Sequence, residues 1–278
     1  MKSVKLLAIV SVLCMVLLAG SLSAFAGEAA DSDLAAIQEK GVIVVGITDF
    51  APMDYKDDNG EWIGFDADLA VVFAQEIGVV VEFQEIDWDN KILELNAGSV
   101  DCIWNGMTLT EEVDAAMECT KTYALNAQVV VMKADALAEY PDVESMKELS
   151  FAVEAGSAGE AVAAEAGLEV NSVQNQAAAL MEVAAGTSDA CVIDKTMADA
   201  MTGEGTSYAD LGYAVALSSE EYVVGFRKGS DAAAVLDEMI TKWIQDGTLA
   251  DLSAKYDNAV SVAEAVEDAE AESEPESK

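Results

Sequence analysis

Short runs of β-branched residues alternate along the chain with longer segments in which apolar residues recur at helical spacing. The run "GVIVVGI" (41–47) is apolar at almost every position, as expected of a strand buried on both faces of a sheet. The segment "GFDADLAVVFAQEIG" (64–78) instead places its large apolar side chains on one helical face. These side chains belong to Leu69, Val72, Phe73 and Ile77.

The same alternation continues toward the C-terminus. A strand is predicted over 79–86, a short helix ending at Gly98, and another strand over 100–104. A second series of strands and helices begins with "AQVVVMK" (127–133), and a last amphipathic helix precedes "DGTLADLSAKY". Alternating strands and helices are typical of parallel βαβ units, so we predict an α/β fold.

Composition and charge narrow the possible functions. The chain has 278 residues, of which 52% are hydrophobic, enough for one large domain or two moderate ones. Its formal net charge of −38 repels nucleic-acid phosphates, so we expect no nucleic-acid partner. The chain contains no histidine, the commonest general base and metal ligand, and we expect neither a metal nor a cofactor.

Residues 1–26 have the pattern of a signal peptide. Lys2 and Lys5 precede an apolar stretch, and "AFA" (24–26) is a small-x-small cleavage site. A transmembrane anchor is the alternative, although the apolar stretch is short for a membrane span. Ser21 stands where a bacterial lipoprotein would have its acylated cysteine, so we expect a released, extracytoplasmic protein.

The remaining cysteines and the C-terminus carry little chemistry. Cys102, Cys119 and Cys191 are widely spaced within apolar runs, which favours buried free thiols, while a Cys102–Cys119 disulfide stays open. Residues 259–278 are mostly Ala, Glu, Ser and Asp, and we expect them to form a disordered acidic tail.

Several motifs follow one another in unbroken order between about residues 38 and 257. They are "GFDADLA", "IDWD", "NGMTLT", "FAVEAGSAGE", "VVGFRKGSD" and "DGTLADLSAKY". In these motifs the chain resembles the amino-acid-binding branch of the bacterial extracellular solute-binding proteins (family 3), which are the extracytoplasmic receptors of ABC importers.

The resemblance implies a type II periplasmic-binding-protein fold, with two α/β lobes joined by two crossing strands and a ligand in the cleft between them. Lobe 1 would comprise 38–126 and 222–258, and lobe 2 would comprise 127–221. The implied ligand is an amino acid or a related small amine. The implied partner is an ABC permease at the membrane, and the protein itself would be a monomer.

On lobe 1, the resemblance implies that Phe50 and Trp88 stack on the ligand. The alternative for each is a core aromatic, although both follow predicted strands, where open α/β sheets bind ligands. Asn105, Gly106 and Thr108 match the strand end whose carbonyl and hydroxyl groups would take the ligand's ammonium. The same segment also reads as the start of a helix.

On lobe 2, Ser157, Ala158 and Gly159 would offer N–H groups at a helix N-terminus, which suits a carboxylate. Glu154 matches the position that contacts the ligand side chain. Asp194 matches the acid that pairs with the ammonium, with an ordinary turn residue as the alternative.

One residue departs from the family pattern. Relatives usually carry an arginine that binds the ligand carboxylate where this chain has Val113, and the next basic residue along the chain is Lys121. A cleft with Glu154 and Asp194 but no arginine would be electronegative, so we expect cationic or polar amino-bearing ligands to be preferred.

Two other functions are compatible with the same fold. One is a secreted enzyme similar to cyclohexadienyl dehydratase, in which only Glu154 or Asp194 could act as acid or base. The other is a ligand-sensing receptor module that acts through a separate partner. We expect a binding protein rather than an enzyme.

Overall fold

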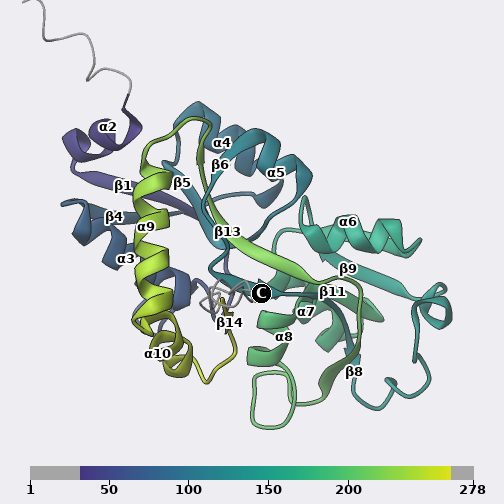
Figure 1. Ribbon diagram of the computed structural model, residues 1–278. Helices are drawn as coiled ribbons and strands as arrows, with labels where there is room; N and C mark the ends of the chain where they lie inside the picture. The colour runs from purple at the N-terminus through teal and green to yellow at the C-terminus, as the bar shows by residue number, and fades with distance from the viewer. Residues whose placement is uncertain (1–31, 264–278) are drawn as a thin grey trace, which may run out of the picture.

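Two separate sheets divide the chain into two lobes that lie side by side (Figure 1). The computed structural model describes residues 32–263. We call the part around the seven-stranded sheet lobe 1 and the part around the five-stranded sheet lobe 2. The predicted two-lobe α/β fold is confirmed. The predicted signal peptide and residues 264–278 of the predicted tail lie outside the described residues.

Lobe 1 contains residues 32–126 and the C-terminal end of the described chain. Its strands are β1 (Val42–Ile47), β2 (Tyr55–Lys56), β3 (Trp62–Ile63), β4 (Val80–Glu85), β5 (Cys102–Thr108), β6 (Met117–Cys119), β7 (Ala124–Asn126), β13 (Glu220–Arg227) and β14 (Ser261–Val262). Its helices are α2 (Asp33–Lys40), α3 (Phe65–Glu76), the short η1 (Trp88–Asn90), α4 (Lys91–Ala97), α5 (Glu111–Ala116), α9 (Ala232–Gln245) and α10 (Thr248–Lys255). The sheet order is β14-β7-β13-β5-β1-β4, with β6 beside β13 and β2–β3 as a separate hairpin.

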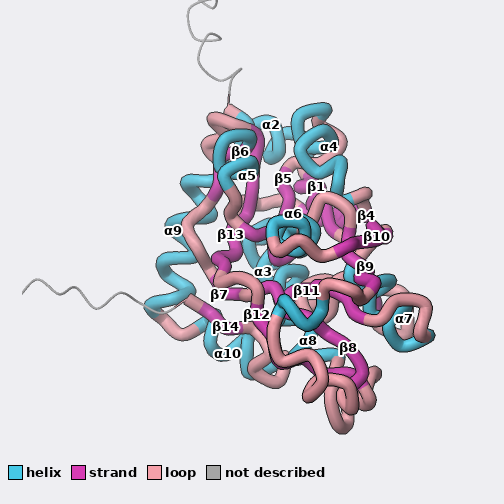
Figure 2. Tube along the Cα trace, turned by 90° about the vertical axis from the view of Figure 1, so that its right-hand side faces the viewer, coloured by secondary structure: helices cyan, strands magenta, loops and turns pink. Residues whose placement is uncertain are grey.

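Lobe 2 contains the middle of the chain. Its strands are β8 (Gln128–Lys133), β9 (Ser150–Glu154), β10 (Glu169–Val173), β11 (Ala190–Asp194) and β12 (Leu211–Ala216). Its helices are the short η2 (Val143–Met146), α6 (Ala158–Glu165), α7 (Gln176–Ala185) and α8 (Lys195–Met201). The order is β10-β9-β11-β8-β12, and β9 runs parallel to β11. β9 and β11 lie next to each other in lobe 2 (Figure 2). Their carboxyl ends therefore lie at the same end of the sheet, and the last residue of each strand lines the cavity described below.

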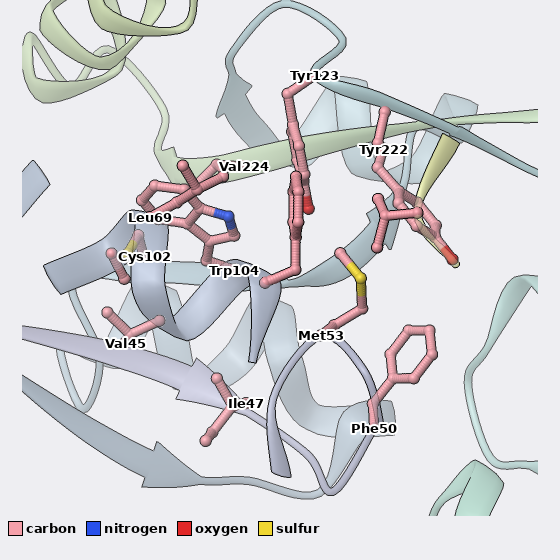
Figure 3. Close-up of a cluster of buried hydrophobic side chains, with 14 of the residues drawn as sticks. Val45, Ile47, Phe50, Met53, Leu69, Cys102, Trp104, Tyr123, Tyr222 and Val224 are labelled. Carbon is pink, nitrogen blue, oxygen red and sulfur yellow. The ribbon is translucent and has the colours of Figure 1, made fainter. Parts of the chain in front are cut away.

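The lobe-1 core explains the apolar runs in this part of the sequence. β1 is buried along most of its length because the sheet is covered on both faces. Behind it, Trp104 lies edge-on to Phe73 and Tyr123, with ring centroids 6.3 and 6.5 Å away (Figure 3). Val72 is 42% exposed, contrary to its expected place on the helix face, because Leu69 and Phe73 with their alanine neighbours already fill that face.

The chain crosses between the lobes twice. It leaves lobe 1 between β7 and β8 through Ala127, and it returns between β12 and β13 through residues 217–219. The return into the lobe-1 sheet therefore begins at Glu220, two residues before the boundary expected from the sequence. Both crossings run beside the cleft described below.

β5 is longer than the sequence indicated. We expected this strand to stop at Trp104, but it continues to Thr108, and its register with β13 shifts between Val223 and Gly225. Gly106 has a φ of 54°, a left-handed conformation that glycine adopts at little cost. The strand therefore bends through a bulge instead of ending.

The prediction of a disordered tail from Ala259 onward is wrong for its first residues. Val260 is buried, and Ser261–Val262 forms β14 against β7. The Ser253 hydroxyl donates to the Val260 carbonyl at 2.6 Å. One buried valine with a backbone partner orders this segment, although the local composition is that of a polar tail.

Two smaller expectations concern the thiols and membrane association. Cys102, Cys119 and Cys191 are free thiols; Cys102 and Cys191 are buried and Cys119 is partly buried. Within residues 32–263, no helix has both the length and the apolar character needed to cross a membrane.

Candidate ligand-binding cleft

A cavity of about 670 Å³ lies between the lobes and is lined by residues of both. Nine of the ten residues predicted to hold a ligand line it, and Gly159 is the exception. Helix α5 of lobe 1 and helix α6 of lobe 2 contribute residues to opposite walls (Figure 1). A cavity of this size is in the range of small-molecule sites.

Two aromatic residues form part of the lobe-1 wall. Phe50 follows β1 and Trp88 follows β4, so both stand at the carboxyl ends of neighbouring parallel strands. Phe50 is 2% exposed and Trp88 is 7% exposed, and Figure 3 shows Phe50 at the edge of the lobe-1 core. Each residue therefore lines the cavity and packs against its own lobe, so the two interpretations made from the sequence are compatible.

The end of β5 is held from inside lobe 1. The Asn105 amide donates to Asp54 Oδ2 at 2.8 Å, and its oxygen accepts from the Thr48 N–H at 3.0 Å. The Gly106 N–H donates to Asp66 Oδ2 at 2.7 Å. The Asn105 side chain and the Gly106 N–H are thus engaged within the lobe, where they position the strand end that borders the cavity.

Glu220 joins the two crossings, and sequence analysis did not single it out. Its carboxylate accepts hydrogen bonds from the Thr108 hydroxyl (2.9 Å), the Gln128 amide (3.0 Å) and the Ser218 hydroxyl (2.8 Å). The Asn126 amide donates to it at 3.2 Å. The Thr108 hydroxyl therefore faces this carboxylate. Nothing in the sequence distinguishes Glu220 from the adjacent Glu221.

Glu154 ends β9 and is 2% exposed. Its Oε1 has no hydrogen-bond partner within the described residues. Burial, and then the nearby Asp194, raises the pKa of Glu154 to about 8, against the opposing effects of Thr48 and Lys91. This raised pKa favours the protonated acid at Glu154 near neutral pH, so the cleft is less electronegative than two ionised carboxylates would make it.

Asp194 ends β11 and is 4% exposed at the cavity wall. It accepts a hydrogen bond from the Tyr222 hydroxyl at 2.7 Å and others from the amides of Asn126 and Gln176. Burial, and then Glu220, raises the pKa of Asp194 to about 7. Asp194 is thus a buried and well-bonded acid, not an exposed turn residue.

The N-terminus of α6 forms another part of the lobe-2 wall. Ser157 caps this helix, since its hydroxyl accepts from the Glu160 N–H at 3.0 Å, and Ser157 and Ala158 both line the cavity. Gly159 lies behind the wall, where an added Cβ would come within 2.8 Å of Gln128 Oε1. Gly159 therefore allows α6 to pack closely against β8, and a ligand contact from it stays a prediction.

A basic residue that the sequence analysis did not consider lines the cleft, although no arginine does so within the described residues. Val113 lines the cavity, as its place in the motif suggested, but so does Lys91, the first residue of α4. Lys91 is 7% exposed, and its Nζ donates to the Gly156 carbonyl of lobe 2 at 2.8 Å. The only sequence signal was its position just after a strand end, because the segment otherwise reads as the start of an ordinary helix.

The family follows from a direct comparison of the sequence. Residues 42–259 match the model of the bacterial extracellular solute-binding proteins, family 3. The chain belongs to this family. Its members are extracellular proteins that bind solutes, as the family description states.

Individual members of the solute-binding family align over most of the chain. The L-cystine-binding protein TcyJ of Escherichia coli (strain K12) is 24% identical over 255 residues, which are 90% of this chain and 94% of that protein. The crystal structure of an ancestral amino-acid-binding protein, AncCDT-1, described as a precursor of cyclohexadienyl dehydratase, is 30% identical with a TM-score of 0.74. The match covers 81% of this chain and 99% of the AncCDT-1 chain. A mutant of ArgBP from T. maritima is 28% identical, with a TM-score of 0.76 and the same coverage.

Proposed function

We propose that this solute-binding protein is the receptor of an ABC importer, which binds an amino acid or a related small amine and delivers it to a permease. The observation that carries this proposal is the set of buried carboxyl groups on the lobe-2 wall. Glu154 and Asp194 line one cavity, and Glu154 Oε1 lacks a donor within residues 32–263. A ligand ammonium would supply that donor to a side chain that is 2% exposed.

The relatives support the same ligand class. Proteins to which this chain is similar are named for binding L-cystine or arginine, each of which carries at least one ammonium group. Phe50 and Trp88 would add aromatic surface against the apolar part of such a ligand. Within this class we propose polar or cationic side chains.

Ligand binding would close the cleft. The cavity is bordered by two lobes that are joined only through the crossings at Ala127 and 217–219, a common arrangement for hinge closure. The permease would detect the closed form. We propose that the protein works as an extracytoplasmic monomer, exported through residues 1–26, and that it does not bind nucleic acid.

An enzyme of the dehydratase type is the second candidate. Two findings favour it: the pKa of Glu154 is raised to about 8, which suits a general acid, and AncCDT-1 is a relative. We propose binding without catalysis, because the relatives include receptors for several amino acids. Incubation with a cyclohexadienyl acid, followed by ultraviolet detection of an aromatic product, tests this choice. Turnover that Glu154→Gln abolishes would establish the enzyme instead.

Release of the native ligand tests the main proposal. Protein purified without unfolding should release an amino acid or small amine on denaturation, identified by mass spectrometry. Protein that has been unfolded, dialysed and refolded should then regain the ligand, show a higher melting temperature and become more compact in small-angle scattering. A released sugar or an acid without an amino group would contradict the ligand class, and binding without compaction would contradict closure of the cleft.

A further inference from the structure

Lys91 is a buried cation at the point where the two lobes meet. It begins α4 of lobe 1, and its Nζ donates to the carbonyl oxygens of Trp88 (3.4 Å) and Gly156 (2.8 Å). The same nitrogen lies 5.1 Å from the centroid of the Trp88 ring. The ammonium therefore occupies the aromatic face that a cationic ligand group would otherwise use.

The charge of Lys91 is not neutralised by an ion pair. Within residues 32–263, no carboxylate oxygen lies within 4.0 Å of its Nζ, and both of its hydrogen-bond acceptors are neutral. Burial lowers the pKa of Lys91, whereas the more distant carboxylates raise it. These carboxylates belong to Glu112, Glu154, Asp89 and Glu160. An ammonium has three donors, and the two carbonyl groups use two of them.

The surroundings of Lys91 suit an anionic group. Gly156 directly precedes the capped N-terminus of α6, and Ser157 and Ala158 line the same cavity as Lys91. The first N–H groups of a helix have no acceptor within the helix. A carboxylate between Lys91 and α6 would contact both lobes at once. Val113, on the same wall as Lys91, offers no charge.

We propose that Lys91 is the residue that binds the anionic end of the ligand, so that the cleft selects a zwitterion, with its carboxylate at Lys91 and its ammonium at Glu154 and Asp194. This inference rests on the proposed function, since it names the ligand class of the same cleft. Lys91, Glu154 and Asp194 line one cavity, so it offers a cationic group and acidic groups to the two ends of a single ligand. An amine without a carboxylate would leave Lys91 buried without an anion, which costs affinity.

Matched pairs of probes test this inference by titration calorimetry. The pairs are L-arginine with agmatine, L-lysine with cadaverine, and L-cystine with cystamine. Each amine lacks only the carboxylate of its amino acid, or both carboxylates in the case of cystine. Wild-type protein should bind at least one amino acid about 30-fold or more tightly than its decarboxylated partner. Lys91→Met keeps the apolar stem of the side chain. This variant should lower the affinity for the amino acid by a similar factor and change the affinity for the amine by less than about threefold.

Two further variants serve as controls. Lys91→Arg keeps a cation and should retain most of the preference for the amino acid. Lys147→Met removes the same charge from a half-exposed lysine that pairs with Glu144 outside the cavity, and it should change neither affinity. Melting curves check that each variant folds. The comparison of amino acid with amine on wild-type protein does not depend on the folding of any variant.

The outcomes separate the two proposals. If wild-type protein binds an amino acid and its amine equally, or if Lys91→Met weakens both equally, then Lys91 only bridges the lobes. The inference would then be wrong while the proposed function stands. If wild-type protein binds neither member of any pair, the proposed function fails, and the inference fails with it.

Discussion

Within residues 32–263, one pair of buried carboxyl groups lies inside lobe 1 and another lines the cleft. The lobe-1 acid pair consists of Asp54 and Asp66, and the cleft acid pair consists of Glu154 and Asp194. All four side chains are at most 4% exposed, and burial is the largest cause of the raised pKa in each of them. By burial and ionisation alone, the two pairs look alike.

Their neighbours differ. The lobe-1 acid pair accepts hydrogen bonds from the Asn105 amide, the Gly106 N–H and the Tyr123 hydroxyl, and neither acid lines the cavity. It holds the end of β5 in place. The cleft acid pair lines the cavity. Within the described residues both pairs have carboxyl oxygens without a donor, on Asp54 and Asp66 as on Glu154, but only that of Glu154 belongs to a residue that a ligand in the cavity can reach. A raised pKa marks buried acids in general, and access to a cavity distinguishes the acids that can meet a ligand.

The largest expected effect lies in the lobe-1 acid pair. Asp66→Ala removes the acceptor of the Gly106 N–H and the Tyr123 hydroxyl, and it should lower the free energy of unfolding by about 2–5 kcal/mol. For a chain of this length the melting temperature should fall by roughly 5–15 °C, measured by circular dichroism. Asp58→Ala, which removes an exposed loop carboxylate, is the control. An unchanged melting temperature would show that Asp66 does not stabilise the fold.

Glu154→Gln should act on binding instead of on stability. The amide keeps the shape of the side chain but loses the charge, so affinity for a bound amino acid should fall by about 1.5–3 kcal/mol. The melting temperature of the empty protein should stay equal or rise, because a buried carboxyl group is removed. Titration calorimetry and thermal unfolding together measure both effects. A large loss of stability with normal affinity would reverse the roles of the two pairs.

A smaller effect is expected from pH. Carboxyl groups whose pKa is raised on folding bind more protons in the folded than in the unfolded state, so stability without ligand should decrease as pH rises from about 5 to 8. An ammonium-bearing ligand needs the ionised acid, so its affinity should increase by about tenfold over the upper part of this range. Calorimetry in buffers of different ionisation enthalpy should detect proton release on binding. Glu154→Gln should reduce that release, and a release unaffected by this variant would contradict the assignment.

The smallest effect is expected for Asp54→Asn. The asparagine oxygen can still accept from the Asn105 amide, and the repulsion between Asp54 and Asp66 disappears. The free energy of unfolding should change by less than about 1 kcal/mol at pH 7, and its decrease between pH 5 and 8 should become shallower. Ligand affinity should be unchanged. A loss of affinity comparable to that of Glu154→Gln would show that the lobe-1 acid pair also acts on the ligand.

The positions of residues within the motifs were enough to predict most of the side chains that line the cavity, but not the contacts that these side chains make. Phe50 and Trp88 follow strands, and Glu154 and Asp194 end strands, whose carboxyl ends border the cavity; all four residues line it. Their hydrogen-bond partners were not predictable, since donors such as Tyr222 come from distant segments. Lys91 was missed for the same reason: its acceptor on Gly156 is 65 residues away in the chain.

The sequence by itself determined the α/β class and the succession of strands and helices, because the spacing of apolar side chains along a segment decides which face it can bury. It also determined which segments end at the cleft, through the order of the strands and the motifs that follow them. Only the tertiary structure decided three features: the presence of a cation in the cleft, the length of β5, and the ordered conformation of the last described residues. Each of these depends on contacts between distant parts of the chain: Lys91 with Gly156, β5 with β13, and β14 with β7. The local spacing of apolar residues carries no information about such partners. Burial by the opposite lobe also sets the strength of the electrostatic interactions that each charged group makes.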